Sequence, residues 1–146
     1  MREFPGRLRH AVPSRVREDS IFHIRVRCRK DNPVGLTDPV LGPTLLESVR
    51  LYARRDRWWP HLFLLMPDHW HALFSFPASE NMSMVIGQWK AFHARHSGIV
   101  WQDNYFDHRL RSDESLSQKA WYIRNNPVVK GLCERAEDWA WVIEGG

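Results

Sequence analysis

The sequence predicts an α+β fold, a ferredoxin-like sandwich in which an antiparallel sheet carries two helices on one face. Three observations indicate this fold: stretches that alternate as strands do, stretches whose apolar residues recur at helical period, and the order of these stretches. The order is strand, helix, strand, strand, helix, strand, followed by an added C-terminal helix. The expected strands are 21–29, 61–66, 69–76 and 105–111, and the expected helices are 44–59, 83–97 and 112–126. The second face of the sheet is then left for a functional site.

The first expected strand has one apolar and one basic face, and it follows a basic arm. Residues 1–19 are rich in arginine and turn residues, so we expect an arm there and a folded domain over 20–146. A row of arginines suits contact with phosphate groups, although alternating charge is also common on half-exposed strands. The apolar face holds Phe22, Ile24, Val26 and Cys28, and the other face holds His23, Arg25, Arg27 and Arg29.

Cap and breaker residues set the expected limits of the helices. Thr44 and Glu47 have the spacing of a capping box, which predicts the start of the first helix, and Pro60 lies beyond its end. Gly98 is the expected C-cap of the second helix. The third helix is expected to begin at Ser112 or Asp113 and to end at Pro127.

Composition predicts an ordinary globular domain with a basic surface. The chain has 146 residues, of which 43% are hydrophobic, which suits one domain with a well-formed core. Its 21 Lys and Arg residues exceed its 17 Asp and Glu residues, a balance that favours a polyanionic partner. Two cysteines give neither a disulfide framework nor a zinc-finger pattern. No signal peptide and no run of about 18 apolar residues is present, so we expect a cytoplasmic protein without a membrane span.

Two histidines, His69 and His71, stand two residues apart in the third expected strand. Side chains at this spacing project from the same face of a strand, whereas Trp70 projects from the other. Two imidazoles on one buried face are costly unless something binds them, so the pair predicts a metal site; hydrogen-bonded core histidines are the alternative. The neighbouring acid, Asp68, is expected to point to the opposite face.

Tyr122 and Asn126 are four residues apart in the third expected helix, so both are expected on one side of it. If this helix crosses the open face of the sheet, Asn126 completes a metal site with His69 and His71, and Tyr122 faces the substrate. The alternative is an ordinary helix end, in which an asparagine before Pro127 caps or turns the chain.

Several motifs, in order along residues 20–141, resemble those of the single-tyrosine HUH transposases, and specifically the REP-associated tyrosine transposases. They are Met66-Pro-Asp-His-Trp-His71, Trp101-Gln102, Phe106-Asp-His-Arg-Leu-Arg-Ser-Asp113, Trp121-Tyr-Ile-Arg-Asn-Asn-Pro-Val-Val-Lys-Gly-Leu132 and Asp138-Trp-Ala-Trp141. The resemblance implies that Tyr122 is a nucleophile and that His69, His71 and Asn126 hold a divalent metal, Mg²⁺ or Mn²⁺.

The implied reaction is a transesterification of single-stranded DNA near a hairpin. The tyrosine attacks a backbone phosphorus, forms a 5′-phosphotyrosine and releases a 3′-hydroxyl, which conserves the bond energy for rejoining. A phenol is largely protonated at neutral pH, so the site has to assist it. Tyr105 is the rival nucleophile, and it lacks a helical ligand partner four residues further on.

DNA contact is expected from basic side chains that follow the phosphates. The candidates are Arg25, Arg27, Lys90, His108, Arg109, Arg111 and Arg124. The resemblance to this branch favours a monomer, with a homodimer possible. Two other functions stay open: a noncatalytic module that binds single-stranded nucleic acid, and a metal-dependent hydrolase that uses activated water without a covalent intermediate.

Overall fold

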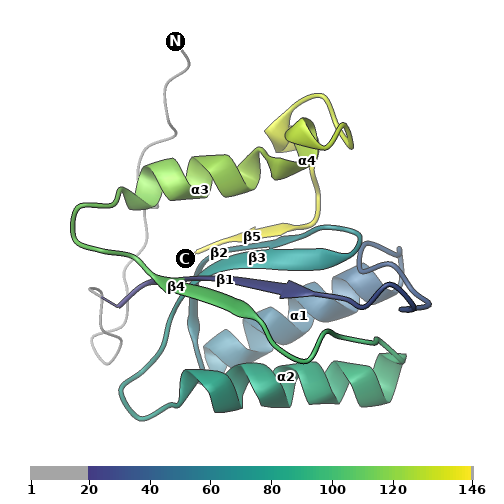
Figure 1. Ribbon diagram of the computed structural model, residues 1–146, viewed down its shortest axis with the longest axis horizontal. Coiled ribbons are helices and arrows are strands. Elements are labelled where there is room, and N and C mark those ends of the chain that lie inside the picture. Colours follow the sequence, from purple (N-terminus) through teal and green to yellow (C-terminus); the bar gives the residue numbers. More distant parts are fainter. Residues whose placement is uncertain (1–19, 146) are drawn as a thin grey trace.

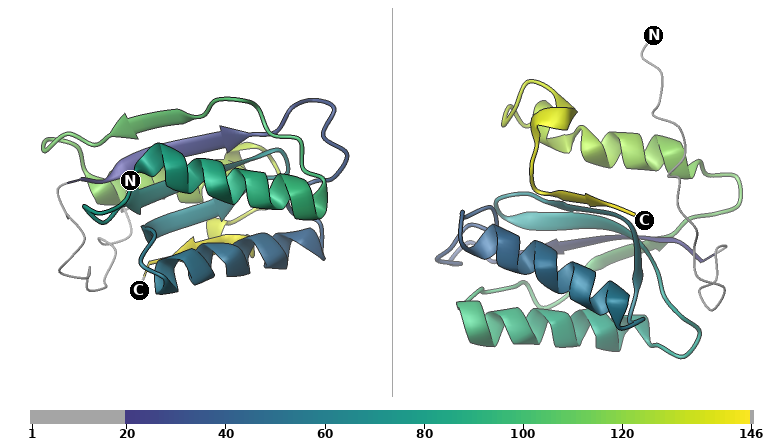
Figure 2. Two further views of the ribbon diagram at one scale, coloured as in Figure 1. Left: turned by 90° about the horizontal axis from the view of Figure 1, so that it is seen from below. Right: turned by 180° about the vertical axis from the view of Figure 1, so that it is seen from behind.

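The computed structural model describes residues 20–145, and within them one antiparallel sheet separates two layers of helices (Figure 1). Helices α1 and α2 lie together against one face, and α3 lies across the other, as Figure 2 also shows. The strands are β1 (Phe22–Arg27), β2 (Trp59–Leu65), β3 (His69–Ser75), β4 (Phe106–Arg109) and β5 (Val142–Glu144). The helices are α1 (Leu41–Arg54), α2 (Met82–Ser97), α3 (Leu116–Arg124), α4 (Asn126–Val129) and the 3₁₀ turn η1 (Ala136–Asp138).

The sheet has the strand order β4-β1-β3-β2-β5, with antiparallel pairing between each strand and its neighbour. The first four strands, with α1 and α2 on one face, give the predicted ferredoxin-like arrangement, so the predicted fold class is confirmed. The expected arm, residues 1–19, lies outside the described residues. Among the described residues, no helix is long and apolar enough to cross a membrane.

The face toward α1 and α2 is apolar. Alternation along β3 directs Trp70, Ala72 and Phe74 into this layer, where they pack with Trp58, the residue before β2, and Trp89 of α2. All five side chains are at most 1% exposed. Burial of such large aromatic surfaces supplies much of the free energy that holds this layer together.

The face toward α3 is apolar only in part. Leu62 and Leu64 of β2 and Leu73 of β3 pack against Ala120 and Ile123 of α3. These contacts hold α3 over β2 and β3, next to the histidines of β3. The helix thereby covers the part of this face formed by these leucines, and polar side chains of β1 and β3 lie beside it.

The last segment of the chain adds the edge strand β5, which the sequence analysis did not predict. Trp139 Nε1 donates a hydrogen bond of 2.9 Å to the Leu65 carbonyl, and Leu65 N donates one of 2.9 Å to the Trp141 carbonyl. The ring of Trp141 lies against Gly42, where a Cβ atom would collide with it. Both tryptophans therefore pack the tail onto the domain.

The predicted start of the first helix is wrong, whereas the predicted C-cap of the second helix is confirmed. Helix α1 begins at Leu41 rather than Thr44, because Asp38 Oδ2 accepts hydrogen bonds of 2.9 Å from Val40 N and Leu41 N and caps the helix. Thr44 lies within the helix, where its hydroxyl donates to the Val40 carbonyl at 3.2 Å. Gly98 follows α2 with φ at 72°, as a C-cap glycine does.

The third helix is also shorter than predicted. It begins at Leu116, after Ser115, whose hydroxyl accepts a hydrogen bond of 3.1 Å from Gln118 N. It ends at Arg124, and after Asn125 the chain enters the short helix α4. The expectation that Tyr122 and Asn126 share one helix is therefore wrong: Tyr122 is in α3 and Asn126 begins α4. Pro127 does not end the helix as expected, because it lies in the first turn of α4, where a missing N–H costs little.

Candidate functional site

The two histidines of β3 project into the polar half of the face under α3. The register pairs Arg25 with His71 and Arg27 with His69, so these four side chains share one face of the sheet. His69 is 5% exposed and His71 is 8% exposed. The strand alternation that buries Trp70 on one side therefore gathers these polar groups on the other.

Three predicted site residues lie in contact with one another. His69 Nε2 is 3.2 Å from His71 Nε2, and Asn126 Nδ2 is 2.9 Å from His71 Nε2. Rotation of the Asn126 amide about its last bond exchanges its nitrogen and oxygen and places the oxygen near the two imidazoles. Helices α3 and α4 thus bring Asn126 to β3 across more than fifty residues of sequence. That these three residues bind a metal stays a prediction.

The outer nitrogens of both imidazoles also have partners. Asp68 Oδ1 is 2.7 Å from His69 Nδ1, and His23 Nε2 is 3.1 Å from His71 Nδ1. Asp68 does not point away from His69 as expected, because it lies in the turn before β3, where strand alternation does not apply. The hydrogen bond with His69 lowers the pKa of Asp68. His69 therefore donates from Nδ1 to a carboxylate and keeps a lone pair on Nε2.

Burial keeps the histidines of this site neutral. It lowers the pKa of His71 to about 3, with the positive charge that His69 and His23 would carry as further causes. It lowers the pKa of His23 to about 4, assisted by Lys119, and it also lowers the pKa of His69. Neutral imidazoles carry the lone pairs that metal coordination requires.

A pocket of about 510 Å³ opens beside these groups. His69, His71, Asn126 and the two arginines of β1 line it. Within residues 20–145, no group of three or more His, Cys, Asp or Glu side chains is arranged to hold a metal ion. A metal at this place therefore requires a further ligand type, and the Asn126 amide supplies one. Two imidazoles, an amide oxygen and an open side suit a divalent ion such as Mg²⁺ or Mn²⁺.

The two candidate tyrosines lie in different layers. Tyr122 is in the last turns of α3, four residues before Asn126, and is 57% exposed. It is not among the residues that line the histidine pocket, and its ring lies 5.3 Å from that of Trp121. Tyr105 packs against the core under α1 and α2, and its hydroxyl is 2.9 Å from Ser83 Oγ in the first turn of α2. Of the two, Tyr122 is the one carried by the helix above the histidines.

The predicted DNA-binding residues fall into three groups. Arg25 and Arg27 line the histidine pocket, and the Arg25 guanidinium lies over the ring of Phe106 at 4.9 Å. Lys130, just after α4, lines the same pocket. The pocket therefore has three cationic side chains in its lining, and contact of these residues with DNA phosphates stays a prediction.

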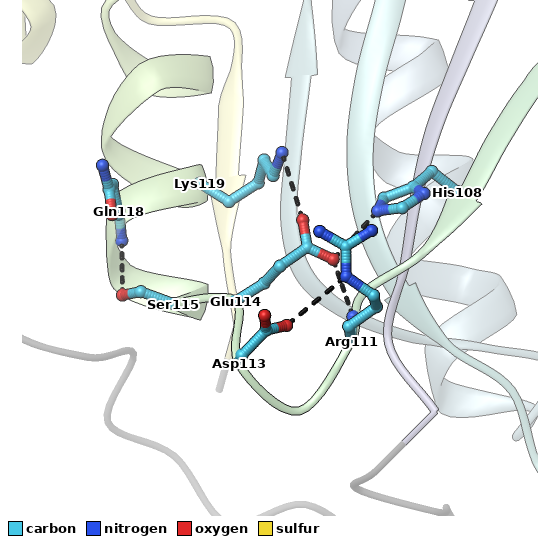
Figure 3. Close-up of polar contacts among 7 residues, drawn as sticks. All are labelled: His108, Arg111, Asp113, Glu114, Ser115, Gln118 and Lys119. Atoms are coloured by element: carbon cyan, nitrogen blue, oxygen red, sulfur yellow. Dashed lines mark hydrogen bonds and ion pairs between the residues drawn. The ribbon is translucent and has the colours of Figure 1, made fainter.

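A second group surrounds the turn between β4 and α3 (Figure 3). His108 Nε2 and Arg111 N both contact Glu114 Oε1, at 2.9 and 2.7 Å, and these bonds lower the pKa of Glu114 to about 2. Arg111 Nε also lies 3.4 Å from Asp113. Arg109 and Arg111 line a hollow of about 670 Å³ next to this turn.

The third group serves internal contacts. Lys90 Nζ donates to the carbonyl of Gln102 at 2.8 Å and so fastens the loop before β4. Arg124 Nε lies 2.9 Å from Glu144 Oε1, and its side chain is 17% exposed, so it joins α3 to β5. A DNA-binding role for Lys90 or Arg124 stays a prediction.

The sequence analysis missed His23 and Phe106 as parts of the site. His23 was placed on the basic face of β1, but its contact with His71 depends on the register between β1 and β3. Phe106 shares that face through its pairing with Arg25 and is 41% exposed. A search for His at alternate positions of the first strand, on the face of the arginines, would have found His23.

Comparison with known proteins supports the resemblance stated from the motifs. No protein-family model matches the chain. A REP-associated tyrosine transposase of Escherichia coli (strain K12) is 23% identical over 101 residues, which are 65% of this chain and 60% of that protein. A protein named for the same family in Haemophilus influenzae is 30% identical over 93 residues, 51% of this chain and 52% of that protein. The matches thus span between half and three fifths of these relatives.

A solved structure of a REP-associated tyrosine transposase bound to a REP hairpin has the same fold. Its TM-score is 0.72 at 19% identity, and the match covers 92% of this chain and 82% of the other. This likeness confirms the antiparallel sheet with its helices. The names of the two curated relatives confirm the predicted resemblance to REP-associated tyrosine transposases.

Proposed function

We propose that this protein is a metal-dependent DNA endonuclease and strand transferase that cuts single-stranded DNA beside a hairpin and holds one cut end on Tyr122. The observation that carries the proposal is the meeting of His69, His71 and Asn126 on the open face, with Tyr122 in the last turn of α3, four residues before Asn126 at the start of α4. The similarity to REP-associated tyrosine transposases, one of which is bound to a REP hairpin, supports the same reading.

The histidines and Asn126 would hold Mg²⁺ or Mn²⁺ through His69 Nε2, His71 Nε2 and the amide oxygen. Such an ion, when bound, polarises a nonbridging phosphate oxygen and stabilises the negative charge of the transition state. The positively charged side chains of the pocket act on the substrate directly. Arg25 and Arg27 bind the flanking phosphates and orient the scissile one toward the site.

Tyr122 performs the covalent step. Its hydroxyl oxygen bonds to the phosphorus as the bond from phosphorus to the 3′ oxygen breaks. The phenolic proton passes to water, and the leaving 3′ oxygen takes a proton from water, so a 5′-phosphotyrosine and a 3′-hydroxyl result. Attack of a 3′-hydroxyl on the phosphotyrosine reverses these steps and joins two strands without ATP. The exposure of Tyr122 lets a DNA strand reach it from solvent.

The path of the DNA follows the basic groups. Lys130 and the arginines of β1 meet the strand at the pocket, and Arg109 and Arg111, which line the hollow beside the turn between β4 and α3, extend the path. Phe106 adds an exposed aromatic ring between these two groups, which suits stacking on an unpaired base.

Gel electrophoresis under denaturing conditions tests this function. The wild type, Tyr122→Phe and Tyr105→Phe are incubated with labelled single-stranded hairpin DNAs, in Mn²⁺, in Mg²⁺ and with a chelator. We expect a metal-dependent protein–DNA adduct in the wild type and in Tyr105→Phe, and none in Tyr122→Phe.

The other outcomes identify the alternatives. Cleavage that persists in Tyr122→Phe without an adduct would indicate a hydrolase that uses activated water. Binding of the hairpins without cleavage in any metal, and unchanged by the chelator, would indicate a noncatalytic binding module.

A further inference from the structure

We propose that His23 is a positioning residue of the metal site: its Nε2 accepts a hydrogen bond from His71 Nδ1 and thereby keeps the lone pair of His71 on Nε2, toward Asn126 and His69. The proposal rests on the proposed function, because it deepens the account of the same site. The observation behind it is the contact of 3.1 Å between His23 Nε2 and His71 Nδ1.

A neutral imidazole has one N–H and one lone pair, so the partner of one nitrogen decides what the other can do. In His69 the carboxylate of Asp68 takes this role, because an ionised carboxylate only accepts. His71 has no carboxylate at Nδ1. Its partner there is a second imidazole, which can accept or donate according to its own tautomer. The state of His71 therefore depends on His23.

The contacts of His71 Nε2 bear on which of the two ring nitrogens of His71 carries the proton. Asn126 Nδ2 lies 2.9 Å from His71 Nε2, and an amide nitrogen only donates. With the amide in this orientation His71 Nε2 is an acceptor, so its proton is on Nδ1 and His23 Nε2 accepts it. If the Asn126 amide is rotated, its oxygen and the lone pair of His71 Nε2 both face the same point, which is the arrangement that a cation stabilises. In these two arrangements Nδ1 carries the proton and Nε2 can bind a metal. In a third arrangement the amide is rotated and His71 Nε2 donates to His69 Nε2, 3.2 Å away, which leaves no lone pair on Nε2 for a metal. The tautomer of His71 distinguishes the third arrangement from the other two.

The fold holds His23 at the required place. The residue lies in β1, the neighbour of β3, and its ring plane is inclined by 25° to that of His71. On its other side the ring of Phe106 meets it edge-on at 5.5 Å. A side chain fixed between two strands keeps the direction of its hydrogen bond, which is what orientation of a metal ligand requires.

Nuclear magnetic resonance of the metal-free protein tests the proposal without any metal or DNA. Long-range proton–nitrogen correlation spectra of the imidazoles distinguish an N–H at Nδ1 from one at Nε2. We expect His71 as the Nδ1–H tautomer in the wild type, and loss of this preference in His23→Leu. A wild-type His71 with its proton on Nε2 would overturn the proposal.

Metal affinity provides the second readout. Binding of Mn²⁺ is followed by electron paramagnetic resonance in the wild type, His23→Leu, His23→Gln and the control His96→Gln, an exposed residue of α2. Loss of an outer hydrogen-bond partner typically weakens a metal site by about 10–100-fold, which we expect for His23→Leu. Gln at this position offers an amide oxygen as acceptor, so His23→Gln should recover most of the affinity, and His96→Gln should equal the wild type.

The results separate failure of this proposal from failure of the proposed function. A wild type that binds no Mn²⁺ would contradict the metal-dependent function itself, and the tautomer measurement would still decide the role of His23. A wild type that binds Mn²⁺, together with a folded His23→Leu that binds it equally well, would overturn the role of His23 and leave the proposed function standing. Circular dichroism confirms that each variant is folded.

Discussion

The two faces of the sheet are built from the same strands but differ in chemistry. Toward α1 and α2, β3 presents Trp70 and Phe74 to a continuous apolar core. Toward α3, it presents His69 and His71, and only Leu73 joins the smaller apolar cluster beneath the helix. One face thus stabilises the domain, while the other gives up part of its apolar area to polar groups. Alternate residues of one strand can therefore be altered with separate effects on stability and on activity.

The largest expected effect on stability comes from Trp70. Its side chain is fully buried between Phe63, Phe74 and Trp89, so Trp70→Ala should lower the free energy of unfolding by about 3–5 kcal/mol. Both variants remove an indole N–H without a hydrogen-bond partner in the described part of the chain, but Trp70→Phe should cost less, because it keeps an aromatic ring and leaves a smaller cavity. Urea unfolding measures both. Equal losses in the two variants would contradict this account of the apolar face.

Substitution of His71, the next residue of the strand, should reduce activity and leave stability largely unchanged. His71→Ala removes a proposed metal ligand, so metal-dependent DNA cleavage should fall by about 100-fold or more, while the protein stays folded. Ser75→Ala, on the same face of β3 but outside the pocket, is the matched control and should cleave as the wild type does. Cleavage rates measured in single turnover check this. Full activity of His71→Ala would remove the basis of the proposed site.

His93 is the polar exception in the apolar layer, and it predicts a pH dependence. Burial, with His96 as a further cause, lowers its pKa from 6.5 to about 4, so between these pH values the unfolded chain takes up a proton that the folded protein does not. Stability should therefore fall as pH falls from 6.5 to 4, by about 3 kcal/mol for this residue, and level off below.

The variant His93→Gln isolates this effect. A glutamine keeps a polar group near Ser48, to which His93 Nε2 is bonded at 2.8 Å, but it does not titrate. Unfolding free energies of the wild type and of His93→Gln, measured from pH 7 to pH 4, should converge as the pH falls. A constant difference across this range would show that His93 titrates in the same way in the folded and unfolded protein.

The smallest expected difference compares equal deletions on the two faces. Ile24→Val in the larger core and Ile123→Val under α3 each remove one methylene, which typically costs about 0.5–1.5 kcal/mol. Hydrogen exchange should show that Ile123→Val raises exchange mainly in α3, whereas Ile24→Val acts on the whole sheet. Exchange that rises equally everywhere in both variants would mean that α3 does not move as a separate unit.

Most features that depend on residues close together in the sequence were predicted correctly. Alternation placed His69 and His71 on one face of β3, and helical period with Gly98 placed α2 almost to the residue. The start of α1 was missed because Asp38, three residues before it, caps the helix more directly than Thr44. Such competition between neighbouring caps is not decided by spacing alone.

Contacts between strands were beyond sequence reasoning. The contact of His23 with His71 follows from the register of β1 on β3. The contact of Asp68 with His69 follows from the turn before β3, to which the two-residue alternation of a strand does not apply. The edge strand β5 has only three residues, and its place depends on how Trp139 and Trp141 dock. Strand register and docking of a tail depend on tertiary packing, so they became visible only in the structure.

Identification of the residue that becomes linked to DNA tests the central claim most directly. The wild type is reacted with a hairpin-bearing single strand in Mn²⁺, the adduct is digested with nuclease and protease, and the peptides are sequenced by mass spectrometry. We predict that the remaining phosphonucleotide is attached to Tyr122, within the helix above His69 and His71. Attachment to Tyr105 or another residue, or cleaved DNA without any modified peptide, would contradict the account.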